Sequence, residues 1–455
     1  MAKSLRTLQQ TLAPSRSAVG DLLSSARMRP EKILPILIGS AIAAAGWLQG
    51  LQWRAAAEAS NSEDLEGEFI ALENELAILR RENESLRSLA QGGGEVKVEP
   101  ALIEFVQESL GFDFRSNPQV HRIAGEELRD RIIASIEARY GPHGLDARQQ
   151  AWMLMGLLNE NDRYAAQLAS TKSIGARSWF DEETGDAWVT DRYDNQSIPD
   201  QAALLRALGR ILLHQHYPPA PGWPGDEAAL AREAIHQGAA LAVENRYLAR
   251  QALGNGFTGV QENNDARDLI ANLPSFVRGT ATFPSILGLP RAARLMDQEE
   301  ILHSLHRPPT NTADLFPGHE GIEPSPPDLP ETPGNPLLDE SVGMLGLKLW
   351  LEPLGEEIPD LADGWRGDRF RLFATSDVES HLIWDIRFDT EERANEFADA
   401  ALDMLSALAG SDEIPAAGEI IETPVERFLS VLRPVPDIVR FINTADREVA
   451  TQLAN

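Results

Sequence analysis

The run His381-Leu-Ile-Trp-Asp-Ile-Arg-Phe388 alternates large apolar side chains with polar ones, a pattern typical of a β-strand. Phe370-Arg-Leu-Phe373 alternates in the same way just before it. A helix is expected at 390–408, and two further strands at 427–432 and 437–442, where Pro434 and Pro436 mark the connection. The last third, 337–455, is therefore predicted to be a small α+β unit with an antiparallel sheet.

The preceding 99–306 are predicted to be mainly helical, because apolar residues recur there every three or four positions. The expected helices are 101–110, 126–140, 147–158, 200–216, 226–253 and a run at 273–305 broken by Pro274, Pro284 and Pro290. Within this region, 177–190 is predicted to be a β-hairpin, with Trp179 and Trp188 in its strands and Gly185 in its turn. Nine prolines in 307–336 indicate a surface loop between the two parts.

Upstream, Lys32 and Arg54 bracket 21 residues without a charge, 33–53, which is long enough to cross a bilayer as a helix. The tail 1–32 carries six basic and two acidic residues, so the positive-inside rule places it in the cytoplasm and the main domain in the periplasm or outside the cell. A cleaved signal peptide and a buried soluble helix are the two alternatives. The length of both the charged and the apolar segment favours an uncleaved anchor.

Residues 60–90 carry a heptad pattern that predicts a short coiled coil and, through it, a homodimer. Charged side chains fill most of the other positions, and an Asn at an a position favours a parallel pair. The predicted dimerisation residues, with leucine at d, are Leu65, Phe69, Leu72, Leu76, Leu79, Asn83 and Leu86. A single helix folded back on its own domain is the alternative. Three consecutive glycines at 92–94 indicate that 91–98 form a hinge.

Composition excludes several classes of function. The formal net charge of the 455 residues is −29, so the body of the protein repels phosphate and nucleic acid is not an expected partner. The chain has no cysteine, which excludes disulfides, thiolate metal sites and a cysteine nucleophile.

Two letter matches to known motifs lack the required context. His319-Glu320 lies in the proline-rich loop, where no helix can hold two metal ligands, and 254–259 resemble a dinucleotide fingerprint but follow a helix. His214, His216 and His236 form the one histidine group worth weighing. Packing at a helix end is the plainer interpretation of these three, and relocated metal ligands are the alternative.

Several stretches, in the right order over roughly 100–445, resemble a known family. Arg177-Ser-Trp-Phe-Asp-Glu-Glu-Thr-Gly185 is similar to its hairpin Gly-Phe-Tyr-Asp-x-x-Thr-Gly, and 206–217 align with its helix His-Glu-x-x-His-Ala-Leu-Gln-Asp-Gln-His-Phe. The run 231–240 resembles the next helix, and 307–312, 364–369 and 384–390 also match. The family comprises extracytoplasmic zinc metallopeptidases of the gluzincin type in bacteria and archaea. The resemblance implies a degenerate zincin-like domain.

The departures from this pattern fall on the chemical positions. Arg206 and Arg210 stand where the resemblance places two histidine ligands, Ala207 replaces the general-base glutamate, and Gln237 replaces the glutamate ligand. Guanidinium groups do not donate lone pairs to zinc, so neither a metal nor another cofactor is expected. The sequence therefore predicts a pseudoenzyme: a membrane-anchored scaffold or interaction module for a protein or peptide.

Arg206 and Arg210 lie four positions apart, on one helix face, and so could together bind an anionic peptide. Alternatively each arginine pairs with an internal acid such as Glu233, since a buried cation must find a partner.

Overall fold

The computed structural model describes residues 96–455, apart from 142, 220–221, 223, 256–263, 356–357, 377–378 and 412. The predicted tail, membrane helix and coiled coil, with its seven dimerisation residues, lie outside the described residues, as do 91–95 of the hinge. None of the helices in the described part is both long enough and apolar enough to cross a bilayer.

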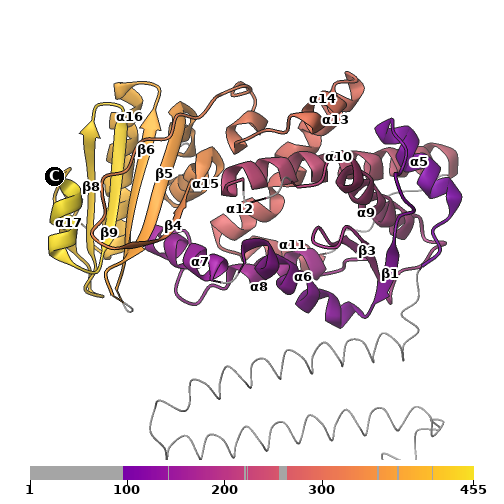
Figure 1. Cartoon of the computed structure of the whole chain (residues 1–455), viewed down its shortest axis with the longest axis horizontal. Coiled ribbons are helices and arrows are strands. Elements are labelled where there is room, and N and C mark those ends of the chain that lie inside the picture. Colours follow the sequence, from indigo (N-terminus) through magenta and orange to yellow (C-terminus); the bar gives the residue numbers. More distant parts are fainter. Residues whose placement is uncertain are drawn as a thin grey trace, which may run out of the picture. The chain divides into compact units, whose positions relative to one another are not determined.

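The described residues have an α+β fold, as predicted, with a mainly helical part and a six-stranded antiparallel sheet (Figure 1). The strand order is β4-β5-β6-β9-β8-β7. The strands are β4 Asn335–Glu340, β5 Trp365–Ala374, β6 Ser380–Phe388, β7 Ile421–Glu422, β8 Phe428–Val435 and β9 Ile438–Thr444. The four strands predicted from the sequence are confirmed as β5, β6, β8 and β9, whereas β4 and β7 were not expected.

The alternation in β6 gives each face of the sheet its own helical partners. Leu382, Trp384 and Ile386 belong to the main core with α15 (Gly343–Leu351) and α16 (Glu391–Ala409). Ile383 belongs to a smaller cluster on the other face, with Val449 of α17 (Arg447–Ala454). Because every side chain on this strand except Arg387 is buried, both faces of the sheet are covered.

The helical part contains the predicted helices and a second, three-stranded sheet. Its helices are α5 Pro100–Leu110, α6 Gly125–Tyr140, α7 Gly144–Met155, α8 Tyr164–Ser173, α9 Ile198–His216, α10 Asp226–Asn255, α11 Asn264–Ala271, α12 Ser275–Phe283, α13 Leu289–Asp297 and α14 Ile301–His306. The predicted hairpin is β2 (Ser178–Phe180) and β3 (Ala187–Thr190), with Trp179 opposite Trp188 and Gly185 at a φ of 75°. An unexpected strand, β1 (Val120–Ile123), pairs parallel with β3.

Two predictions in this part were wrong. Pro284 and Pro290 do not break the helical run, because a π-helical segment, η1 (Pro284–Gly288), joins α12 to α13 without interruption. The segment 307–336 is not wholly a surface loop. It contains a 3₁₀-helix, η2 (Thr312–Leu315), in which Thr312 is fully buried and donates hydrogen bonds to Glu227.

One core cluster spans the helical part and the sheet. This cluster draws on α6, α7 and α8 as well as on α15, α16 and the sheet, whereas α9 and α10 belong to a second cluster. Trp350 of α15 donates its indole N–H to the carbonyl oxygen of Met155 over 2.7 Å. The residues from 96 onward thus pack as a single unit.

Asp368 of β5 organises the start of α15. Its carboxylate is 1% exposed and accepts five hydrogen bonds of 2.7–3.0 Å. The donors are the Ser341 hydroxyl, the backbone N–H groups of Val342 and Gly343, and the indole N–H groups of Trp365 and Trp384. Four of these donors are N–H groups buried with no access to water, so the carboxylate satisfies them together.

We predict that D368N destabilises the protein by about 3 kcal/mol or more, since an amide NH₂ would face at least two buried N–H donors. Urea unfolding followed by tryptophan fluorescence measures this loss. D399N, on the exposed face of α16, serves as the control and should change the free energy of unfolding by less than about 0.5 kcal/mol. Equal effects of the two substitutions would contradict the role given to Asp368.

Candidate functional site

A cavity of about 1000 Å³ lies in the helical part, bordered by α6, α8, α9, α10 and the β2–β3 hairpin. The four positions that the resemblance assigns to a former metal site all line it. Arg206, Ala207 and Arg210 come from α9, and Gln237 comes from α10. The structure therefore brings these four positions to the wall of one cavity.

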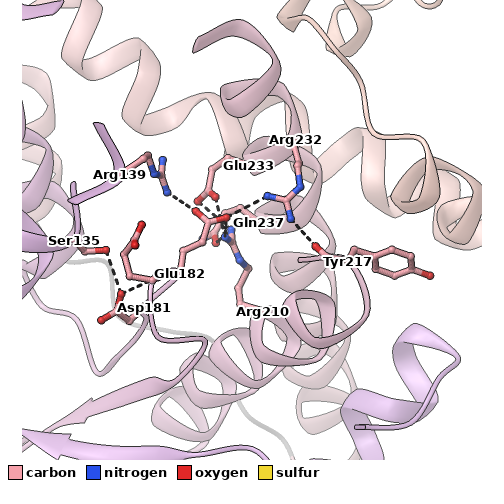
Figure 2. A network of polar contacts seen from close by, with 10 residues as sticks. Ser135, Arg139, Asp181, Glu182, Arg210, Tyr217, Arg232, Glu233 and Gln237 are labelled. Atoms are coloured by element: carbon pink, nitrogen blue, oxygen red, sulfur yellow. Dashed lines mark hydrogen bonds and ion pairs between the residues drawn. The ribbon is translucent and has the colours of Figure 1, made fainter. Parts of the chain in front are cut away.

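Arg210 is held at the wall of this cavity by residues of α10 (Figure 2). Its guanidinium donates to both oxygens of Glu233, over 3.0 and 2.8 Å, and to the amide oxygen of Gln237 over 3.2 Å. Burial alone would raise the pKa of Glu233, but the Arg210 guanidinium holds it well below its ordinary value. The pair is thus ionised, and the arginine also occupies the amide oxygen of Gln237, the residue that the resemblance places at the third ligand position.

Arg206 has a separate partner. Its guanidinium lies 3.2 Å from the carboxylate of Glu244, seven residues beyond Gln237 on α10. Burial raises the pKa of Glu244 despite this neighbour. Both arginines therefore pair with internal acids, and they do not present a shared pair of free positive charges to the cavity.

Glu182, in the turn of the hairpin, contacts cations from three helices. It pairs with Arg139 of α6, with Arg232 of α10 at 3.2 Å and with Arg210 at 4.0 Å. Asp181 and Gly185 close this turn through backbone hydrogen bonds. Nothing in the spacing of the sequence pointed to Glu182, because its partners lie 43, 28 and 50 positions away.

The three histidines considered as relocated ligands point to different surroundings. His216 bonds through Nε2 to the Asp113 carbonyl at 2.7 Å, and His214 packs against the Phe180 ring. His236 is 3% exposed, and burial together with Arg232 lowers its pKa well below the ordinary value. Within the described ranges, no three His, Cys, Asp or Glu side chains are grouped so that they could hold a metal ion.

Glu227, in the first turn of α10, also lines the cavity and went unrecognised in the sequence. Its carboxyl group is 7% exposed and is bonded by the backbone N–H and hydroxyl of Thr312, over 2.8 and 3.0 Å. Burial raises its pKa to about 8, with Asp368 and Asp226 adding to the shift. Glu227 therefore remains largely protonated near pH 7.

Comparisons with known proteins reach only the C-terminal part of the chain. A family described as a domain of unknown function, DUF8575, matches residues 335–433, which run from β4 into β8. No curated protein and no solved structure matches the chain. The match leaves α6 to α10, and with them most of the cavity, uncovered.

We predict that E227Q alters the pH dependence of stability. A folded pKa of about 8 against an ordinary 4.5 means that Glu227 stabilises the fold fully below pH 4.5 and that this contribution is lost as pH rises through 8. Glutamine keeps the neutral form, so E227Q should gain stability over the wild type between about pH 5 and pH 8, by an amount on the order of 4 kcal/mol.

Urea unfolding at several pH values measures the difference between the two proteins. E108Q, at an exposed position of α5, is the control and should follow the wild type throughout. A constant offset between E227Q and the wild type over this range would contradict the assignment of a protonated Glu227.

Proposed function

We propose that this protein is a non-catalytic relative of gluzincin-type metallopeptidases, a membrane-anchored interaction module that binds a ligand or partner in the retained cavity. The observation that carries the proposal is the set of hydrogen bonds from the Arg210 guanidinium to Glu233 and Gln237. These bonds connect Arg210 directly to Gln237, and both stand at positions that would hold the metal in an active relative.

A dication would find little to bind there. The guanidinium has no lone pair to offer, repels a second positive charge and uses the Gln237 oxygen that could otherwise serve as a ligand. Ala207 has no acidic group to accept a proton from water. These features favour binding over hydrolysis as the role of the cavity.

The two alternative functions have weaker support. A metallopeptidase using His214, His216 and His236 would need His216 to leave the Asp113 carbonyl and turn toward the other two. Binding of an anionic peptide by Arg206 and Arg210 would require it to displace Glu244 and Glu233. Each alternative therefore begins with the loss of an existing contact.

Reverting the four positions tests the relation to metallopeptidases. We predict that the full-length wild type, purified in detergent, carries no stoichiometric zinc, whereas R206H/A207E/R210H/Q237E binds about one zinc per chain. Elemental analysis after dialysis against zinc measures both. Circular dichroism checks folding, since Glu233 and Glu244 lose their partners in this variant.

The matched control is R206N/A207E/R210N/Q237E, which should bind no zinc because it lacks both histidines. Stoichiometric zinc or chelator-sensitive peptide hydrolysis in the wild type would overturn the proposed function. A folded reverted variant that binds no more zinc than its control would argue against the metallopeptidase ancestry.

The dimer is part of the same proposal and rests on the heptads of 60–90. We predict that L72S/L79S, at two d positions, converts a dimer of the full chain in detergent into a monomer. Multi-angle light scattering measures the mass. N74S/R81S, at outward f positions of the same heptads, should remain dimeric, and a dimer that survives L72S/L79S would contradict the coiled coil.

A further inference from the structure

The cavity lies between two hydrophobic core clusters. The first core cluster contains Ile132 and Ile136 of α6, the second contains Ala207 of α9, and all three residues line the cavity. Among the described residues, no buried member of the first cluster comes from α9 or α10, and none of the second comes from α6, α7 or α8. The walls of the cavity therefore belong to two separately packed parts of the molecule.

Three parts of the chain contribute buried side chains to both core clusters. They are the helical run from α12 through η1 to α13, the 3₁₀-helix η2, and α15. In the helical run, Val277 belongs to the first cluster and Ala292 to the second. In α15 the neighbours Met344 and Leu345 belong to different clusters. A change in the width of the cavity therefore has to be accommodated in these three parts.

The helical run loses its regular hydrogen bonding at the π-helical segment η1. Pro284 and Pro290 have no N–H group, so the carbonyl groups of Thr280 and Ile286 lack the donors that an α-helix would give them. Sharp bends in helices occur at prolines and at π-helical turns, and such turns are frequent at functional sites. The run can therefore bend at η1 more easily than elsewhere.

Hydroxyl groups weaken the same stretch further. Thr280, Thr282 and Ser285 each donate a hydrogen bond of 2.8–2.9 Å to a backbone carbonyl three or four positions earlier. Such bonds compete with the backbone bonds of a helix and often bend it. Pro284 and Ser285 also line the cavity, so the stretch that can bend lies at the cavity wall.

The two ends of this stretch are held by different core clusters. A Cβ on Gly288 would lie 2.2 Å from the carbonyl oxygen of Ala234, so η1 ends in close contact with α10. At the other end, Val277 of α12 is fully buried in the first core cluster. Bending at η1 would thus move α10 relative to the first core cluster.

We propose that η1 is a hinge about which α9 and α10 move relative to α6 and α8, so that the cavity widens and narrows. Ion pairs join α6 to the hairpin, one between Arg131 and Asp181 at 3.2 Å and one between Arg139 and Glu182. The two arginine side chains are 31% and 30% exposed, so water can replace the carboxylates when the parts separate. This inference rests on the proposed function and concerns the admission of a ligand to the same cavity.

Spin labels can test the hinge directly, because the chain has no cysteine of its own. E137C/N245C places exposed labels on α6 and α10, on the two sides of the cavity, whereas E137C/D399C places both labels in the part that contains the first core cluster. Double electron–electron resonance is measured on the full-length chain in detergent, diluted with unlabelled chain so that distances within one chain dominate. We predict two distance populations for E137C/N245C and one for E137C/D399C.

Proline substitutions assign the motion to η1. P284A/P290A restores two backbone donors and favours a regular α-helix, so the longer-distance population of E137C/N245C should be lost. P274A/P333A replaces prolines before α12 and before β4 and is the matched control, in which both populations should remain. Should P284A/P290A not fold, the wild-type background decides, since one population for E137C/N245C excludes the hinge and two populations support it.

A single population for E137C/N245C, two populations that persist in P284A/P290A, or loss of the longer one in P274A/P333A would each overturn this inference. None of these results affects the zinc measurements on which the proposed function depends. Conversely, stoichiometric zinc in the wild type would overturn the proposed function, and the distances would still report whether the two parts move.

Discussion

The burial of charge between α9 and α10 constrains the whole helical part. Arg210 is 5% exposed, and a guanidinium in such a place must be met by acceptors from the neighbouring helix. Arg210 pairs with Glu233 and Arg206 with Glu244, so the later residue on α9 meets the earlier one on α10, as in an antiparallel pair of helices. A buried pair of this kind adds little net stability, but removal of one partner is costly, so the two helices are held to one arrangement.

The need of buried polar groups for hydrogen-bond partners also links parts of the chain that are far apart in sequence. Glu227 begins α10 and finds its donors on Thr312, 85 positions later. Thr312 in turn accepts the backbone N–H of Leu345 in α15, and the start of α15 is bound by Asp368 of the sheet. A chain of buried polar contacts therefore runs from the cavity to the sheet.

Local patterns in the sequence predicted most helices and the central strands, and they failed where tertiary contacts decide. β6 was recognisable because its side chains alternate, whereas β4 has exposed and half-buried residues only and lies at the edge of the sheet. The prolines predicted a surface loop at 307–336. No local pattern indicated that Thr312 is buried there and donates hydrogen bonds to Glu227. At the site, spacing placed Arg206 and Arg210 on one face, and Glu233 was foreseen as a partner. Glu182 comes from another element, and only the fold brings it near.

The shape of the cavity depends on the packing of α10 against the π-helical segment as well as on the side chains that line the cavity. Gly238, next to Gln237 on α10, packs so closely on the π-helical segment that a Cβ there would lie 2.3 Å from the carbonyl of Gly288. A Cβ on Gly288 would likewise lie 2.2 Å from the carbonyl oxygen of Ala234. This contact fixes the back of α10 and so keeps Glu233 and Gln237 turned toward Arg210. Apolar side chains at positions 206, 210 and 237 would let the walls collapse onto each other, because close packing is favourable. Charged side chains that are paired along the wall, as Arg206 and Arg210 are, keep it polar, and the space stays open to a ligand.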